Sequence, residues 1–212
     1  MLLERTVPIK QVIIALAVSL LLILTTFLSI GYAYFWDKYP NKTMAEREIQ
    51  KYALEVGDDQ KNIAAHLNLG WAQEQQGFYD EALDQFDQAL KLDPNNPTAH
   101  FNKGLVLQKK HRIDEAIAEF NKVRQLDWEY VDPTFNLAEL YFAKGDYQNA
   151  ISNLKYYLGV NRSSSNGHFL LGQVYEAEGV RNMAISEYRA ALAYDPAYRE
   201  ARDALNRLGV KD

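Results

Sequence analysis

Apolar residues recur every three or four positions along most of the chain, in runs that polar turns separate. One such run contains Ala82, Leu83, Phe86, Ala89 and Leu90. This spacing gathers the apolar side chains on one face of an α-helix, whereas a half-buried strand would show strict alternation. The pattern therefore predicts an all-α chain.

The helical runs repeat with a period of 34 residues from Ile63 to Tyr198. Small residues keep one phase throughout, namely Gly70, Gly104, Ala138 and Gly172 at the eighth position of each repeat and Ala82, Ala116, Ala150 and Ala184 at the twentieth. A period of this length is typical of stacked units that cannot bury their apolar faces alone. Four units are predicted, over residues 63–96, 97–130, 131–164 and 165–198.

Within a unit, two helical runs flank a turn at the fifteenth position. Gly77, Gly145 and Gly179 stand at that turn, where the C-terminus of a helix favours a positive φ. Pro94 and Pro196 follow the second runs of their units, and proline cannot continue a helix because it lacks an amide hydrogen. Each unit is therefore predicted to be a hairpin of two helices.

These positions resemble the tetratricopeptide repeat (TPR) family, whose pattern places Leu-Gly at positions seven and eight, alanine at twenty, an aromatic at twenty-four and proline at thirty-two. The resemblance covers residues 63–198 and implies a right-handed α-solenoid of four TPR helix hairpins. Trp128 and Arg162 replace the proline of two units, His111 replaces one glycine, and Lys103 replaces one leucine. These departures leave the local turn geometry open.

Helices are expected at both ends of the array, because an uncapped solenoid exposes apolar surface. Upstream, Thr43 and Glu46 fit a capping box, which predicts a helix over about 43–56 within segment 37–62. We expect that helix to pack on the first unit. Downstream, segment 199–212 predicts a C-terminal capping helix with apolar Ala201, Ala204 and Leu205 on one face.

Residues 11–36 contain no charged side chain and follow a short tail, residues 1–10, that carries Arg5 and Lys10. A helix of this length exceeds the roughly 30 Å hydrocarbon thickness of a bilayer. The predicted fold class is therefore all-α, with a single N-terminal transmembrane helix over 11–36, the solenoid and its C-terminal capping helix. A cleaved signal peptide is the alternative interpretation of the apolar segment.

The charges around this segment are almost balanced, since Lys38 and Lys42 follow it. A short basic tail before one apolar segment is the usual form of an anchor whose domain lies outside the cytoplasm. The sequence thus predicts a single-pass membrane protein with an extracytoplasmic TPR domain, and a cytoplasmic domain is the alternative. The absence of cysteine fits either side.

The chain has a formal net charge of -5 and no basic run, which argues against nucleic acid as a partner. It contains no nucleophile elbow, phosphate-binding glycine loop or paired metal-ligand motif. His66, His100 and His168 share the fourth position of their units, where a packing role is expected. No enzyme activity, cofactor or metal is predicted, and the expected partner is a protein or peptide.

The resemblance also implies a groove lined by the first helix of each unit, at positions two, five, six, nine, twelve and thirteen. Position five is mostly phenylalanine and position six mostly asparagine. Phenylalanine suits apolar side chains of a peptide, and an asparagine amide can donate to and accept from its backbone. Packing within the scaffold is the alternative. The predicted protein-binding residues are Leu67, Asn68, Trp71, Phe101, Asn102, Leu105, Phe135, Asn136, Glu139, Phe169 and Gln173.

The basic residues with which one class of TPR domain grips a C-terminal carboxylate are missing at positions two and five, so chaperone tails are not expected ligands. The predicted function is a membrane-anchored scaffold or adaptor for protein–protein interaction, acting in assembly of a membrane or secreted complex. The alternative is a structural subunit or self-associating array that binds no peptide in its groove.

Overall fold

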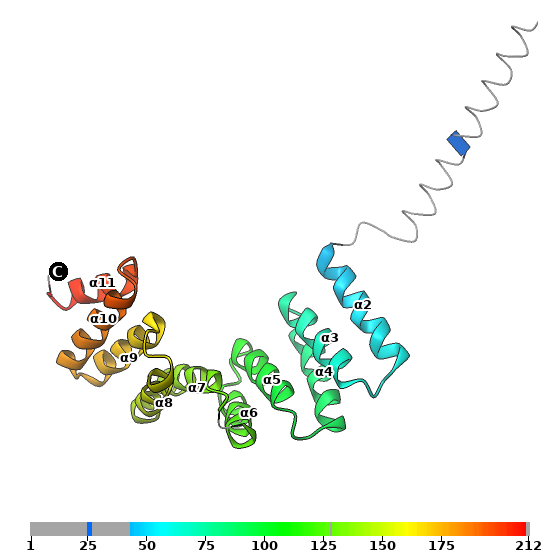
Figure 1. Ribbon diagram of the computed structural model, residues 1–212, viewed down its shortest axis with the longest axis horizontal. Coiled ribbons are helices and arrows are strands. Elements are labelled where there is room, and N and C mark those ends of the chain that lie inside the picture. The colour runs from blue at the N-terminus through cyan, green and yellow to red at the C-terminus, as the bar shows by residue number, and fades with distance from the viewer. Residues whose placement is uncertain (1–24, 27–42, 128, 211–212) are drawn as a thin grey trace, which may run out of the picture. The chain divides into compact units, whose positions relative to one another are not determined.

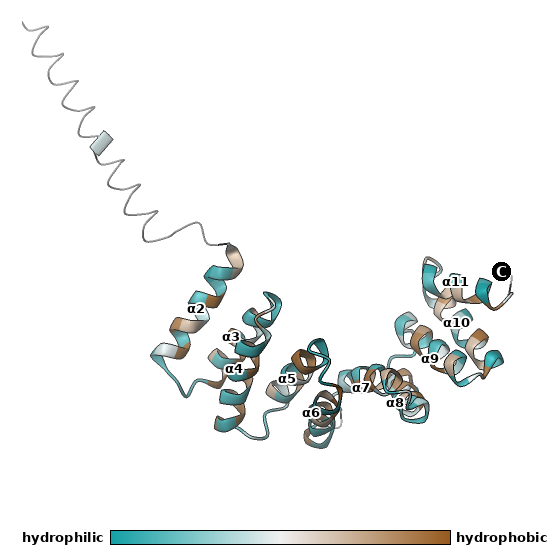
Figure 2. Cartoon of the chain, turned by 180° about the vertical axis from the view of Figure 1, so that it is seen from behind, coloured by the Kyte–Doolittle hydropathy of each residue, from teal (hydrophilic) through white to brown (hydrophobic). Residues whose placement is uncertain are grey.

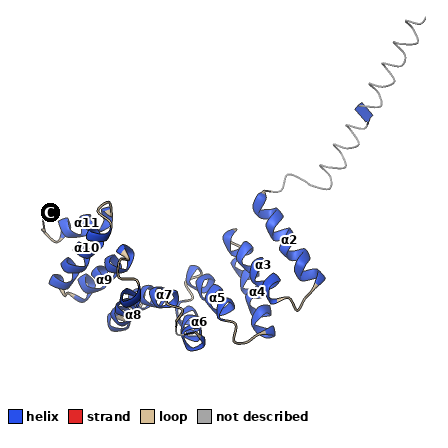
Figure 3. Cartoon of the chain, viewed as in Figure 1, coloured by secondary structure: helices blue, strands red, loops and turns tan. Residues whose placement is uncertain are grey.

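The computed structural model describes residues 25–26, 43–127 and 129–210. Every regular element within these residues is a helix (Figure 3). The chain divides into two compact units, Met1–Arg47 and Glu48–Asp212, and the second holds the repeats. The helices are α2 (Met44–Asp58), α3 (Ile63–Gln75), α4 (Tyr79–Leu92), α5 (Pro97–Lys109), α6 (Ile113–Leu126), α7 (Asp132–Ala143), α8 (Tyr147–Val160), α9 (Ser165–Glu178), α10 (Arg181–Tyr194) and α11 (Arg199–Arg207).

The predicted transmembrane helix is not supported, and the fold class is corrected to an all-helical TPR solenoid. Among the described residues, no helix combines the length and the apolar character that crossing a bilayer requires. The longest, α2, has 15 residues, whereas a span needs about 20 apolar ones. Within segment 11–36 only Thr25 and Thr26 are described, and the rest of that prediction lies outside the described residues. The same finding overturns the predicted location as a single-pass membrane protein.

The helices of the second unit pack as consecutive hairpins. α3 packs on α4, α5 on α6, α7 on α8 and α9 on α10, and each second helix also contacts the first helix of the next hairpin (Figure 1). Most helices carry both hydrophobic and hydrophilic residues (Figure 2), because only the faces turned to neighbouring helices are buried. The core therefore lies between successive helices, in one cluster around Phe86 and Phe120 and another around Leu154 and Tyr188.

In three of the four hairpins, the two helices meet where a glycine lies against an aromatic ring. A Cβ added to Gly70 would lie 2.7 Å from Phe86, and one added to Gly172 would lie 2.6 Å from Tyr188. Both rings are almost completely buried. Glycine at the eighth position thus makes room for a large side chain in the core.

The turn inside the second hairpin is the same as in the others although His111 replaces glycine. His111 has a φ of 56°, in the left-handed region that Gly77, Gly145 and Gly179 also occupy. Its amide donates to Gln108 O at 2.9 Å, as that of Gly77 donates to Glu74 O at 3.0 Å. The departure in sequence therefore leaves the turn geometry unchanged.

Lys103, which replaces leucine in the second unit, forms ion pairs with two acidic residues. Its Nζ lies 2.8 Å from Asp87 Oδ1 on α4 and 2.9 Å from Glu119 Oε1 on α6. Burial opposes the charge of Lys103, but the hydrogen bonds to both carboxylates outweigh it and raise its pKa. A polar contact between the first two hairpins thus replaces an apolar one.

The helix α2 begins at the predicted capping box. The Thr43 amide donates to Glu46 Oε2 at 2.7 Å, and the Glu46 amide donates to Thr43 Oγ1 at 3.2 Å. Ile49, Tyr52 and Val56 form a half-buried stripe, and no residue of the helix is fully buried.

The repeat also extends further upstream than predicted. Asp59 Oδ1 accepts from the amide two residues later, as Asp93 and Asp127 do at intervals of 34 residues. Asn62 then caps α3 as Asn96 caps α5. The helix α2 therefore occupies the place of a second helix in an incomplete preceding unit.

At the other end, α11 packs on α10 through Ala201, Ala204 and Leu205, which are buried. Its other face exposes Arg202 and Asp203. An Arg181 guanidinium nitrogen donates to Leu208 O just after the helix ends. A charged outer face of this kind disfavours further stacking of repeats.

Candidate functional site

The predicted binding residues all lie on the first helices of the four hairpins, α3, α5, α7 and α9. Among the first helices, α3 contacts α5 and α7 contacts α9. We call the side formed by these four helices the groove face. It brings some of the predicted residues together and leaves others apart.

A cleft of about 380 Å³ opens on the groove face between α3 and α5. Four predicted residues line it, Trp71, Phe101, Asn102 and Leu105. The Trp71 side chain is 48% exposed, which is high for so large an apolar group. We call this cavity the α3–α5 cleft.

The buried ring of Phe86, on α4, also lines the α3–α5 cleft, and three polar residues of the cleft were not among the predicted ones, Glu74, Gln75 and Lys109. Glu74 pairs with Lys109 and accepts from Gln75 Nε2 at 2.7 Å. The Glu74 side chain is 8% exposed and that of Lys109 is 47% exposed, so the ion pair presents its cation to solvent. These residues occupy positions twelve and thirteen, which the family pattern assigns to the groove, so the same rule could have found them.

The phenylalanines of position five are half-buried against other aromatic rings. The Phe101 ring centroid lies 5.7 Å from that of Phe120 and 5.1 Å from that of Tyr130. Phe169 is held in the same way between Tyr188 at 5.6 Å and Tyr198 at 5.1 Å. These rings stabilise the hairpins, and only their remaining exposed edges can contact a partner.

Phe135 follows the same rule, since its ring centroid lies 5.2 Å from that of Tyr157. It does not line the α3–α5 cleft.

The asparagines of position six differ from the phenylalanines. The side chains of Asn68, Asn102 and Asn136 form no hydrogen bond to any other residue in the described part of the chain. Asn68 is exposed, and the other two are half-exposed. Their amides therefore keep their donors and acceptors for solvent or a ligand.

The remaining predicted residues lie outside the α3–α5 cleft. Leu67 and Gln173 are half-buried, whereas Leu170, which replaces asparagine at position six in the fourth unit, is buried. Glu139 accepts from Gln108 Nε2 at 3.1 Å. Burial raises the pKa of Glu139, against the opposing effect of the Gln108 hydrogen bond.

The histidines of position four connect the two helices of their hairpins. His100 Nδ1 lies 2.5 Å from Glu119 Oε2, and its Nε2 lies 3.1 Å from Pro94 O. His168 contacts Glu187 Oε2 at 2.7 Å and Arg162 O at 3.0 Å in the same way. Their role is thus polar bonding within the scaffold as well as the expected packing.

Family models for tetratricopeptide repeats match most of the array. One model described as "TPR repeat" matches residues 74–111, and one described as "Tetratricopeptide repeat" matches 135–179. A second tetratricopeptide repeat model matches 97–127 and 166–198. The chain therefore belongs to the tetratricopeptide repeat family.

Solved structures share the fold at low sequence identity. The crystal structure of MamA is 19% identical, covering 73% of this chain and 96% of that chain, with a TM-score of 0.67. The 41-to-end segment of MamA from Desulfovibrio magneticus RS-1 is 18% identical, covering 68% and 81%, with a TM-score of 0.65. YrrB, described as a TPR protein with an unusual peptide-binding site, is 22% identical, covering 71% and 77%, with a TM-score of 0.64. A comparison with curated proteins found no match.

Membership of the family implies a scaffold for protein–protein interaction. In the described residues, no group of three or more histidine, cysteine, aspartate or glutamate side chains is arranged to hold a metal ion.

Proposed function

We propose that this protein is an interaction scaffold whose α3–α5 cleft binds an extended segment of a partner protein. The observation that supports this is the meeting of an exposed indole, Trp71, and an amide without an internal partner, Asn102, at one cavity. Ligand sites typically combine an apolar lining with a few well-placed polar groups. An apolar side chain of the partner would enter between Trp71 and Leu105.

The polar groups of the cleft give the partner segment a direction. The Asn102 amide would donate to a backbone carbonyl and accept from a backbone amide of the segment. Glu74 is already paired with Lys109, so its carboxylate is not free to bind a cation of the partner. The exposed side of Lys109 would face the partner and would repel such a cation. We therefore expect a segment with one apolar anchor and no cation beside it. We further infer an adaptor role in assembly of a larger complex, since consecutive first helices offer an extended binding surface.

The test is selection of peptides that bind the full chain, followed by titration of each peptide against variants. Trp71→Ala is expected to weaken binding by about 2 kcal/mol, as buried tryptophan anchors usually do. Asn102→Ala should weaken it by about 1 kcal/mol through lost hydrogen bonds. Gln88→Ala, at an exposed position of α4, is the matched control and should leave affinity unchanged.

Peptides that bind Trp71→Ala as tightly as the unaltered chain would contradict the proposal. Melting each variant by circular dichroism separates a loss of binding from a loss of fold.

A further inference from the structure

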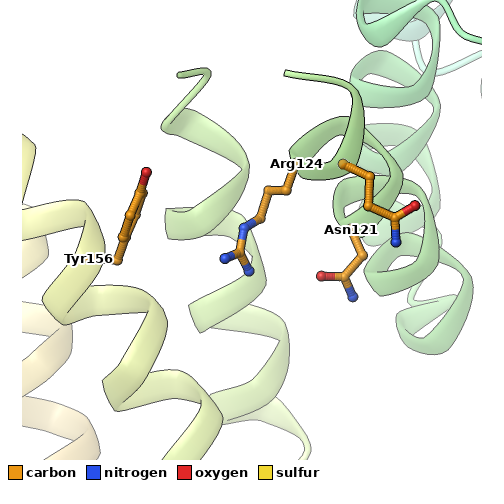
Figure 4. A pocket seen from close by; sticks show the side chains of 4 residues that line it. Asn121, Arg124 and Tyr156 are labelled. Atoms are coloured by element: carbon orange, nitrogen blue, oxygen red, sulfur yellow. The ribbon is translucent and has the colours of Figure 1, made fainter. Parts of the chain in front are cut away.

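A second pocket, of about 400 Å³, lies between α6 and α8 (Figure 4). Asn121, Arg124 and Gln125 line it from α6, and Tyr156 lines it from α8. It is formed by second helices, whereas the α3–α5 cleft opens between first helices. Among the described residues, no acidic side chain lines this pocket, although the chain as a whole is acidic.

The arginine is held in place by its neighbours. Arg124 Nη1 donates to Asn153 Oδ1 at 3.2 Å, and the guanidinium lies 6.0 Å from the Tyr156 ring centroid. Asn153 is only 8% exposed, and its own Nδ2 donates to Asn149 O at 2.8 Å. The acceptor for Arg124 is thus fixed by a second hydrogen bond, which limits the positions the guanidinium can take.

Packing alone does not account for an arginine here. The other three units carry leucine at the same position, Leu90, Leu158 and Leu192. The buried acceptor Asn153 is also specific to this junction between hairpins. In the other units, a histidine of the first helix contacts the residue equivalent to Asn153. The third unit has Thr134 in place of that histidine, so Asn153 has no side-chain partner on α7 among the described residues. Arg124 and Asn153 therefore depart from the repeat together, at one junction between hairpins.

The two cations that line another pocket, formed by α4, α5 and the start of α6, are already paired with carboxylates. Lys103 pairs with Asp87 and Glu119, and Arg112 pairs with Glu115. Arg124 forms no ion pair with any residue that the structure describes. Its remaining guanidinium hydrogens are available for an anion.

We propose that the pocket between α6 and α8 binds an oxyanion, a carboxylate or phosphoryl group carried by a side chain of a partner protein. The planar guanidinium of Arg124 matches the two oxygens of such a group with parallel hydrogen bonds. The amides of Asn121 and Gln125 form no hydrogen bond to other described residues and supply neutral donors from the same helix. Tyr156 closes the opposite side, and its ring supports the cation.

The experiment titrates the ¹⁵N-labelled full chain with inorganic phosphate and, separately, with a peptide carrying a single glutamate, each against sodium chloride of equal ionic strength. A saturable shift of the Arg124 Nε–H resonance is expected with at least one probe. Saturation by phosphate alone would identify a phosphoryl ligand, and saturation by the peptide alone a carboxylate.

Three variants decide whether the pocket is responsible, with Tyr156 and backbone resonances as the readout. Arg124→Leu restores the residue of the other units, so the fold is retained, and it should weaken binding about tenfold or more. Arg124→Lys should also weaken binding, because an ammonium lacks the fork geometry. Arg189→Leu, at an exposed arginine of α10, is the matched control and should have no effect. Unchanged affinity in Arg124→Leu, or no saturable response to either probe, would overturn the proposal.

Discussion

The third hairpin differs from the other three where its two helices are closest. In the first, second and fourth hairpins a glycine faces an aromatic ring, in the pairs Gly70–Phe86, Gly104–Phe120 and Gly172–Tyr188. The third hairpin has Ala138 and Leu154 at these positions, and both are fully buried. A smaller side chain on one helix makes room for a methyl group on the other. Close packing therefore constrains the two positions as a pair.

A second pair of positions shows the same contrast. His66, His100 and His168 contact Gln85, Glu119 and Glu187 across their hairpins. In the third hairpin, Thr134 Oγ1 instead donates to Val131 O at 2.6 Å, and Asn153 accepts from Arg124 of the preceding unit. A polar contact within a hairpin has thus been replaced by one between hairpins. The comparison teaches that repeat positions change in matched pairs.

The largest expected effect comes from placing an alanine opposite an unchanged ring. In Gly104→Ala the new Cβ would lie 2.8 Å from Phe120, which is fully buried. We expect a loss of about 2 kcal/mol in the free energy of unfolding, because overpacking outweighs the better helix propensity of alanine. Urea unfolding of the full chain, followed by circular dichroism, measures this loss.

The paired control recreates the third hairpin in the second. Gly104→Ala combined with Phe120→Leu should lose less stability than the sum of the two single losses. Purely additive losses would show that the two positions are not coupled.

A smaller effect is expected when one histidine contact is removed. His168→Thr leaves Glu187, 18% exposed, without its ring N–H partner and removes the stacking of His168 on Tyr194 at 5.4 Å. A loss of about 1–2 kcal/mol is expected from the unpaired acceptor. Adding Glu187→Asn, the pair found in the third hairpin, should recover part of it. The free energy of unfolding in urea is the measurement.

His111 provides the matched control for this histidine. His111→Gly removes a histidine from a turn with positive φ, so stability should stay the same or rise. A comparable loss in both variants would argue that the His168 contact has no special role.

The smallest expected effect concerns Glu139 of the third hairpin. Because burial raises its pKa, the native state holds this proton to higher pH than the unfolded chain does. Stability should therefore fall as pH rises from the usual carboxyl pKa of 4.5 to the raised native value, and then stay level. Glu139→Gln should remove this fall and raise stability at neutral pH by less than about 1 kcal/mol. Thermal melts between pH 4 and pH 8 test it, and an unchanged slope would contradict the assignment.

The sequence predicted the repeated hairpins well because their cause is local. Apolar spacing, a glycine turn and a small residue at a fixed phase each act within about 34 residues, so they can be read along the chain. The same reading missed that His111 adopts the glycine conformation and that α2 continues the repeat. The turn at His111 is shown by its φ and its backbone hydrogen bond, whereas Asp59 and Asn62 do recur in phase with Asp93 and Asn96 and were overlooked.

The binding residues were harder to predict than the fold. Position alone placed Phe101, Phe135 and Phe169 in the groove, but each ring packs against tyrosine or another phenylalanine. Trp71 and Asn102 carried the same positional signal and line the α3–α5 cleft, where Phe101 contributes only the edge that its packing leaves exposed. Which of these side chains stays accessible depends on neighbours from other helices.

By itself, the sequence determined the helices, their period and their family, since these follow from local spacing and from residue types that recur at one phase. Only the tertiary structure decided where a cleft opens, that Glu74 and Lys109 form an ion pair in it, and that Arg124 meets Asn153 from the next hairpin. The reason is physical: a cavity or a contact between hairpins is set by how side chains distant in sequence fill shared space, and that space exists only once the helices have packed.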